Sequence, residues 1–225
     1  GFVSRVTRGR PWVRVKLAAS LDGRTALAGG ASRWITGAAA RADVQQFRAR
    51  SSVVLTGAGT VLADDPELNV RIDGASSQPL RALLDSQLRV PPTARLFAGA
   101  GPTVVFTAAL DAGRRGALEQ RGVRVESVPV AAGGGLDLGA VLARLAALEA
   151  NEVWVEAGPR LAGALLAARL ADELVIYLAP CLLGPQALPL AQLPELQSLD
   201  ARLALRYESV EQCGDDLRII ARCLV

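Results

Sequence analysis

The chain has 225 residues, 51% of them hydrophobic and 21% charged, which is typical of a globular protein and excludes a disordered one. Its net charge of +3, without a basic tract beside aromatic residues, argues against a nucleic-acid-binding surface. No uncharged apolar run approaches the ~20 residues of a membrane helix. Because histidine is absent, zinc hydrolysis and a Ser-His-Asp triad are excluded.

In chain order, short apolar runs bounded by turn residues alternate with helical patterns. Strands are expected over 12–19, 52–55, 80–84, 103–106, 123–128 and 152–155, and helices over 36–50, 111–120, 137–149 and 159–170. Asp137 has the position of an N-cap. Asp64-Asp65-Pro66 is expected to end a short helix, because the residue before a proline avoids helical geometry. This alternation favours helices packed on a mostly parallel sheet, which is an α/β fold.

The last third of the chain differs. A strand is expected over 173–178, followed by two long strands within 202–225 that turn at Cys213-Gly214-Asp215-Asp216. Such a hairpin would add antiparallel strands and make the sheet mixed.

The cysteines indicate the compartment. Cys181, Cys213 and Cys223 are widely spaced and odd in number, so they form neither a disulfide framework nor a metal-binding pattern. We therefore expect a cytoplasmic protein without a bound metal. Methionine is also absent, and we expect the chain to begin inside a longer polypeptide.

Several predicted strands end in small or polar residues, which allow a ligand to approach the backbone and also provide hydrogen-bonding groups. In open α/β sheets, ligands bind beyond the carboxyl ends of the strands. These ends are Thr56-Gly57, Asp85-Ser86, Thr107 and Glu156-Ala157-Gly158. The sequence therefore predicts a ligand cleft at this edge.

Two further segments have open interpretations. Gly158-Pro159 begins a helix whose first amides can bind a pyrophosphate, or it caps a helix that only packs on the sheet. The acids of 60–71 indicate either a solvated turn or the wall of a polar pocket.

Basic residues raise the same question. Arg41 and Arg48 flank the apolar stripe of the helix over 36–50, where they either lay their stems along the buried edge or clamp a phosphate. Lys16 is the only lysine of the chain, at the end of an apolar strand, and it is either an ordinary strand-edge residue or a functional amine.

Together these motifs resemble one family, the reductase domain of the bifunctional riboflavin-biosynthesis deaminase–reductase. The resemblance extends over nearly the whole chain in the right order. It is carried by Lys16-Leu17-Ala18-Ala19-Ser20-Leu21-Asp22-Gly23-Arg24, Ser32-Arg33-Trp34-Ile35-Thr36, 60–71, Asp85-Ser86 and Val155-Glu156-Ala157-Gly158-Pro159. It implies a dihydrofolate reductase-like, three-layer α/β fold with helices on both faces of the sheet.

The resemblance also implies an activity, the NADPH-dependent reduction of 5-amino-6-(5-phosphoribosylamino)uracil with hydride delivered to ribose C1′. It implies NADPH contacts at Ala18, Trp34, Thr60, Asp64, Ser86, Gly158, Pro159, Arg160, Leu161, Ala162, Gly163 and Ala164. The implied substrate contacts are Ser32, Arg48, Leu68, Arg71 and Glu156. Lys16, Asp64 and Glu156 would be the charged groups nearest the reacting carbon. The cofactor carries the hydride chemistry, so the protein mainly aligns donor and acceptor.

Bacterial members of that family usually carry an N-terminal zinc deaminase domain, whose signatures are absent here. We therefore expect residues 1–11 to be a linker from such a domain and residues 12–225 to be the reductase domain. The family commonly forms homodimers, for which the C-terminal hairpin could supply the interface. Two alternatives remain: another dihydrofolate reductase-like pyrimidine or pterin reductase, and a catalytically silent nucleotide-binding module.

Overall fold

A computed structural model describes residues 1–75 and 77–224. By its internal contacts the chain forms two compact units. Unit 1 comprises Gly1–Trp12 and Gln45–Trp154, and unit 2 comprises Val13–Val44 and Val155–Val225. The chain passes from one unit to the other three times, so neither unit is a continuous segment.

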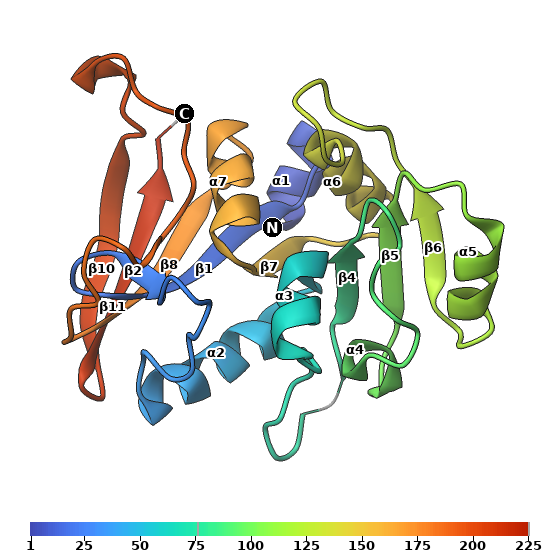
Figure 1. The fold of residues 1–225 in the computed structure, drawn as a ribbon, viewed down its shortest axis with the longest axis horizontal. Helices are drawn as coiled ribbons and strands as arrows, with labels where there is room; N and C mark the ends of the chain where they lie inside the picture. The colour runs from blue at the N-terminus through green and yellow to red at the C-terminus, as the bar shows by residue number, and fades with distance from the viewer. Residues whose placement is uncertain (76, 225) are drawn as a thin grey trace. The chain divides into compact units, whose positions relative to one another are not determined.

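Unit 1 is built on parallel strands (Figure 1). β3 (Val53–Gly57), β4 (Leu80–Leu84), β5 (Thr103–Thr107) and β6 (Arg124–Ser127) pair in this order, and each of these pairs is parallel. β7 (Glu152–Glu156) crosses the boundary between the units after Trp154. The helices of unit 1 are α1 (Phe2–Arg8), α3 (Ala58–Asp64), α4 (Arg95–Ala98), α5 (Ala112–Glu119) and α6 (Leu138–Ala147).

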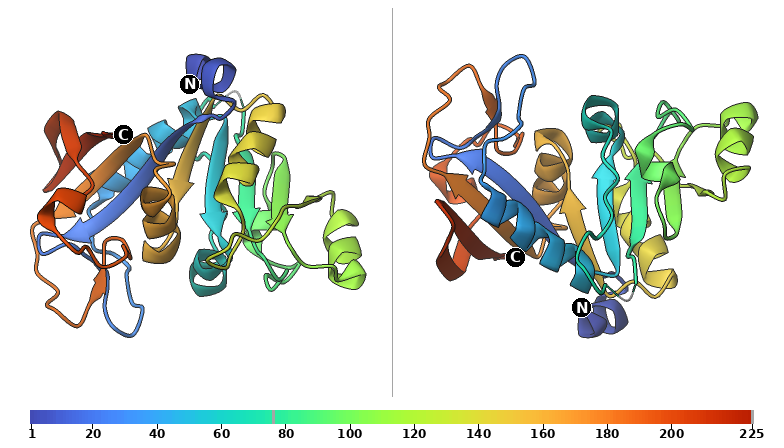
Figure 2. Two further views of the ribbon diagram at one scale, coloured as in Figure 1. Left: turned by 90° about the horizontal axis from the view of Figure 1, so that it is seen from above. Right: turned by 90° about the horizontal axis from the view of Figure 1, so that it is seen from below.

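The apolar runs of the sequence form the buried strands of unit 1. All five residues of β5 are buried, as expected for a parallel strand covered on both faces. α3 lies next to β3, and α5 lies next to β6 at the end of the strand row (Figures 1 and 2). Asp137 accepts a 3.0 Å hydrogen bond from the Ala140 amide, which confirms it as the N-cap of α6.

Unit 2 contains the antiparallel strands. β1 (Trp12–Ser20) and β8 (Glu173–Ala179) are parallel, β11 (Asp216–Cys223) is antiparallel to β8, and β10 (Leu205–Cys213) is antiparallel to β11. β2 (Arg24–Ala26) and β9 (Leu188–Pro189) form a small separate sheet. α7 (Pro159–Ala167), the 3-10 helix η1 (Leu199–Ala201) and the first half of α2 (Ala38–Arg50) complete the unit.

A polar cluster around the buried Tyr177 ties α2 to the hairpin. The Tyr177 hydroxyl donates a 2.7 Å hydrogen bond to Asp43, and Arg218 Nη1 donates to both oxygens of the same carboxylate at 3.0 and 3.1 Å. Burial and the Asp43 charge raise the pKa of Tyr177 well above its usual range, so the hydroxyl stays protonated and keeps donating.

The expected mixed, mostly parallel sheet with a C-terminal antiparallel hairpin is confirmed. Three details differ from expectation. Residues 58–60 form the first turn of α3, for which only the end was predicted, and Lys16 lies in the middle of β1 rather than at its end. Residues 2–8 of the expected linker form α1, although their role as a junction stays a prediction. Among the described residues, no helix has the length and apolarity needed to cross a membrane.

Candidate active site

β1 positions the first predicted group. Val13, Val15, Leu17 and Ala19 are buried on one side of the strand, whereas Lys16 and Ala18 alternate with them and are half-buried. The period of two along a strand places Lys16 and Ala18 on the same face. In the parallel pairing with β8, Lys16 is opposite Val175 and Ala18 is opposite Tyr177. Residues before and after Lys16 pair with β8, so Lys16 lies in a well-paired part of the strand and not at a frayed end.

The turn after β1 is fixed by Asp22, for which no role was predicted from the sequence. Asp22 accepts hydrogen bonds from the Ser20 hydroxyl, at 2.5 Å, and from the amides of Leu183 and Gly184. The Ser20 hydrogen bond is the main cause that lowers the pKa of Asp22 to about 2. Asp22 thus joins the end of β1 to the segment after β8. Its position in the Ser20-Leu21-Asp22-Gly23 turn was the signal available in the sequence.

α7 carries the expected glycine-proline start. Gly158 is its N-cap and Pro159 follows in the first turn. Gly158, Arg160 and Ala164 are exposed, while Ala162 and Gly163 are buried. A Cβ at position 163 would clash with the backbone of Gln192, so this glycine is needed for packing. Glu156 lies half-buried at the end of β7, two residues before the cap.

The loop over 27–37 carries Ser32 and Trp34. Trp34 is 69% exposed, and the guanidinium carbon of Arg41 lies 4.5 Å from its ring centroid. Arg41 also donates a 2.8 Å hydrogen bond to the Thr36 carbonyl. The guanidinium of Arg41 therefore makes a cation–π contact and also holds the backbone of this loop. Ser32 is half-buried.

In unit 1, α3 brings Thr60 and Asp64 together, because positions four residues apart lie on one face of a helix. Asp65 ends α3 in the left-handed region, at φ 42°, with its amide bonded to Val61, as expected for the helix stop.

The segment after α3 carries the predicted substrate residues. Leu68 also has a positive φ, 52°, and its side chain is 3% exposed, which leaves its backbone for any ligand contact. Arg71 is exposed, with Nη1 3.1 Å from Asn69 Oδ1 and 3.9 Å from Glu67 Oε2. The hydrogen bond that Glu67 accepts from Arg95 is the main cause that holds the pKa of Glu67 below its usual value.

Arg48, at the end of α2, is nearly buried, and its Nη1 donates a 2.8 Å hydrogen bond to the Asn69 carbonyl. One donor of this guanidinium therefore holds the segment that carries Arg71. The sequence left open whether Arg48 clamps a phosphate or lays its stem along the buried edge, and it carries no signal for this loop contact.

Ser86 follows β4 and is half-buried. The preceding Asp85 is buried and accepts a 2.8 Å hydrogen bond from the Val90 amide, which closes the turn over 85–90. This turn and α5 border a groove of about 340 Å³, lined by Leu88, Arg89, Val90, Pro91, Pro92, Gly113, Arg114, Ala117 and Leu118. The groove lies beyond the carboxyl ends of β4 and β5, two neighbouring parallel strands.

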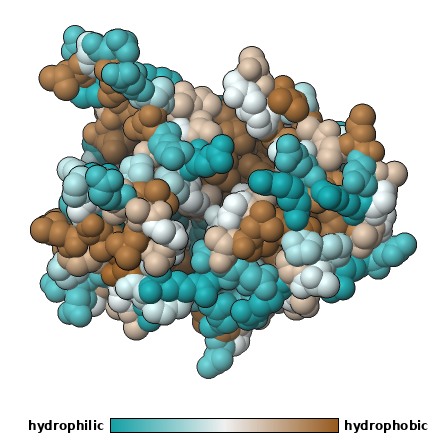
Figure 3. Space-filling model, viewed as in Figure 1, coloured by the Kyte–Doolittle hydropathy of each residue, from teal (hydrophilic) through white to brown (hydrophobic). Residues whose placement is uncertain are grey.

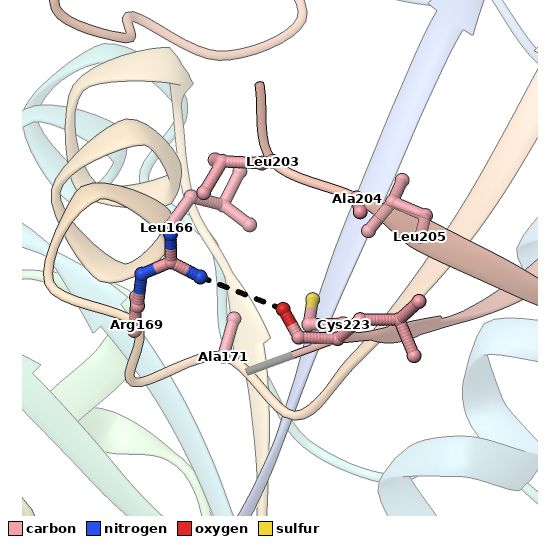
Figure 4. A pocket seen from close by; sticks show the side chains of 8 residues that line it. Leu166, Arg169, Ala171, Leu203, Ala204, Leu205 and Cys223 are labelled. Atoms are coloured by element: carbon pink, nitrogen blue, oxygen red, sulfur yellow. Dashed lines mark hydrogen bonds between the residues drawn. The ribbon is translucent and has the colours of Figure 1, made fainter. Parts of the chain in front are cut away.

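A second pocket lies between α7 and the hairpin of unit 2 (Figure 4). Its volume is about 20 Å³, and Leu166, Leu203 and Leu205 are among its lining residues. Burial raises the pKa of Cys223 in its wall to about 11, which keeps the thiol protonated and unreactive. The pocket has room for about one water molecule and none for a nucleotide.

The predicted site residues thus divide between the units. Unit 2 carries Lys16, Ala18, Ser32, Trp34, Glu156 and the start of α7, and unit 1 carries Arg48, Thr60, Asp64, Leu68, Arg71 and Ser86. The described residues contain no group of three or more His, Cys, Asp or Glu side chains placed to hold a metal ion.

These features define an α/β protein with polar residues and a helix start at the ends of parallel strands. The profile of the RibD C-terminal domain family matches residues 11–219, and the chain belongs to this family.

Curated relatives agree with the family profile. The chain is 42% identical over 233 residues to the riboflavin biosynthesis protein RibD of Haemophilus influenzae, covering 97% of this chain and 60% of that protein. It is 34% identical to a 5-amino-6-(5-phosphoribosylamino)uracil reductase of Buchnera aphidicola subsp. Acyrthosiphon pisum, covering 85% of this chain and 96% of that protein. The chain thus spans about 60% of the length of the Haemophilus influenzae relative and 96% of the Buchnera aphidicola relative.

A solved structure of Acinetobacter baumannii RibD is also similar, with a TM-score of 0.88 and 35% identity over 100% of this chain and 61% of that one. Together with the strand pairing, this likeness confirms the dihydrofolate reductase-like α/β fold that the resemblance implied.

Proposed function

We propose that the chain reduces 5-amino-6-(5-phosphoribosylamino)uracil with NADPH, giving the ribitylamino product of riboflavin biosynthesis. The observation that carries the proposal is the family membership over 11–219, together with a relative of that name that the chain covers almost completely. When bound, the nicotinamide would supply the hydride to C1′ of the open-chain imine, and a proton must reach the nitrogen for the charges to balance.

Three charged residues are assigned to the reacting carbon. Lys16 holds a ribose hydroxyl or assists the proton transfer, and its place in the middle of β1 fixes the backbone from which the ammonium extends. Asp64 and Glu156 orient the ribose chain. Both are half-buried, so their carboxylates are reachable yet restrained.

The remaining cofactor contacts are assigned to Ala18, Trp34, Thr60, Asp64, Ser86 and residues 158–164. The first amides of α7 suit a pyrophosphate, because a helix start offers unpaired N–H donors and a favourable dipole. Ser86 and the exposed Arg89 suit the adenosine 2′-phosphate, and Arg89 lines the groove beside the Ser86 turn. This arrangement supports NADPH over NADH.

On the substrate side, Ser32, Leu68 and Glu156 join Arg48 and Arg71. The exposed guanidinium of Arg71 binds the phosphate of the substrate. Arg48 contributes charge from its buried position and holds the backbone of the same segment.

The proposed partners follow from the surface and the relatives. Most of β10 is exposed, and apolar atoms gather where β10 and β11 run (Figure 3). The exposed apolar or aromatic side chains on these two strands include Tyr207, Val210 and Leu217. An edge strand of this kind can pair with its copy, so we propose a homodimer through β10. A zinc deaminase domain, fused or separate, would supply the substrate in the cytoplasm, with no nucleic acid or membrane involved.

A single assay tests the function: oxidation of NADPH by the purified chain with and without the phosphoribosylaminouracil. We expect turnover only with that substrate, unchanged by a chelator or by zinc. NADPH binding without turnover would support a silent nucleotide-binding module instead, and turnover of another pyrimidine or a pterin alone would support a different reductase.

A further inference from the structure

Three successive residues beside the predicted substrate arginine are held by side chains of unit 1. Arg48 donates to the Asn69 carbonyl at 2.8 Å. The Gln78 side chain pairs with Val70 in both directions, accepting from its amide at 2.8 Å and donating to its carbonyl at 3.0 Å. Gln45 Oε1 accepts a 2.9 Å hydrogen bond from the Arg71 amide. The segment therefore has side-chain partners of the kind that a neighbouring strand would otherwise supply.

Gln78 is itself restrained. Gly101 has φ 95°, and a Cβ added there would lie 2.7 Å from Gln78 Cβ, so the turn before β5 packs closely against the stem of this glutamine. Pro79 follows Gln78 and leads directly into β4. The amide that grips Val70 is thus anchored at the start of a core strand.

Gln45 is anchored on the other side. It lies on α2 three residues before Arg48, so both side chains leave the same face of the helix. The stripe of α2 beside them is buried through Phe47, which stacks on Trp154 with ring centroids 4.6 Å apart. The backbone of Arg71 is therefore fixed by rigid elements, while its guanidinium stays exposed.

We infer that Gln45 and Gln78 are positioning residues that hold the Asn69–Arg71 backbone so that Arg71 presents its guanidinium to the substrate phosphate. The inference rests on the proposed function only for the identity of the ligand. Ordering a flexible arginine segment at the moment of binding would cost affinity, and a segment ordered in advance avoids that cost.

The two glutamines make different hydrogen bonds, since Gln45 only accepts one whereas Gln78 accepts one and donates one, and their variants can therefore be told apart. Gln45→Met and Gln78→Met keep side-chain length but remove the hydrogen-bonding groups. Gln46→Met is the matched control, because Gln46 is the exposed neighbour on the same helix. Gln45→Glu retains an acceptor oxygen for the Arg71 amide, so it is the conservative rescue.

For the phosphorylated substrate we expect KM to rise roughly fivefold in Gln45→Met and more in Gln78→Met, which loses two hydrogen bonds, with kcat within about twofold of wild type. A dephosphorylated substrate should show no such rise. Hydrogen exchange should become faster at the Arg71 amide in Gln45→Met and at the Val70 amide in Gln78→Met. Gln45→Glu should restore protection of Arg71, and Gln46→Met should match wild type throughout.

Binding of ribose 5-phosphate, measured by calorimetry, separates this inference from the proposed reaction. If wild type does not turn over the uracil substrate, the proposed function fails, but weaker ribose 5-phosphate binding in the two Met variants still supports the inference. It is overturned if ribose 5-phosphate does not bind wild type, or binds the variants equally well. It is also overturned if the amides keep their protection, or if both substrates are affected alike.

Discussion

The guanidinium of Arg48 donates a 2.8 Å hydrogen bond to the carbonyl of Asn69, two residues before Arg71. Two arginines with the same expected role therefore occupy different environments: Arg48 is 7% exposed and holds backbone, whereas Arg71 is exposed. Their replacement should have different consequences.

Arg71→Ala should raise KM for the phosphorylated substrate roughly ten- to a hundredfold with little change in kcat, because a hydrogen bond to a charged group contributes ~1.5–3 kcal/mol. A dephosphorylated substrate should not distinguish the variant from wild type. Arg48→Ala should raise KM as well and also lower Tm, since it leaves the partly buried Asn69 carbonyl without its donor. Steady-state kinetics on both substrates and thermal unfolding check this. Equal losses on both substrates for Arg71→Ala would assign the arginine a structural role.

Lys16→Ala and Asp64→Ala should lose turnover while remaining folded, because both side chains are half-buried and leave little cavity. Glu156→Gln retains shape without charge and should also lower kcat. Asp73→Ala is the control, since Asp73 lies exposed in the loop before β4. Single-turnover kinetics and circular dichroism are the measurements. Near-normal kcat at saturating substrate in any of the three variants would remove that residue from the chemistry.

NADPH should be preferred over NADH, and Arg89→Ala should reduce the ratio of their kcat/KM values by weakening only NADPH. Arg89 lines the groove beside the Ser86 turn, and a guanidinium binds a phosphate through charge-assisted hydrogen bonds. Arg121→Ala, an exposed arginine just beyond α5 that does not line the groove, should leave the ratio unchanged. Equal kcat/KM values for both cofactors in wild type would contradict the assignment.

Stability should fall in acid partly through Asp22. Its pKa is lowered from 3.8 to about 2 in the folded chain, so its ionised form stabilises the fold above about pH 4. That contribution declines as pH falls toward 2, because both folded and unfolded states then become protonated. Asp22→Asn should therefore unfold at lower urea than wild type at pH 6, with the gap closing between pH 4 and pH 2. A gap that does not change with pH would assign the effect to packing.

The chain should sediment as a dimer, and Val210→Lys should shift it toward the monomer. Val210 is exposed on β10, where an added charge would be buried on pairing. Arg206→Lys on the same strand retains charge and is the control. Analytical ultracentrifugation over a range of concentrations measures the shift. A wild-type monomer at all concentrations would exclude the β10 interface.

Much of the fold could be predicted because its signals are local. Buried parallel strands appear as apolar runs, and Asp111 and Asp137 stand where helices α5 and α6 begin. The hairpin turn at Gly214-Asp215 was visible too, since Gly214 adopts the positive φ, 67°, that glycine tolerates. The end of α3 at Asp64 was predicted but its start was missed, because glycine and alanine there are compatible with both a loop and a helix.

The candidate site was predictable only as residue types. The sequence by itself determined that Lys16 lies in an apolar strand, that Asp64 ends a helix and that Gly158-Pro159 begins one, because each depends on neighbours in the chain. Tertiary structure alone decided that Arg48 binds the Asn69 carbonyl and that Gln45 and Gln78 grip the two residues that follow. Those partners lie 8 to 26 residues apart along the chain, and no periodic pattern encodes a hydrogen bond between segments that folding brings together.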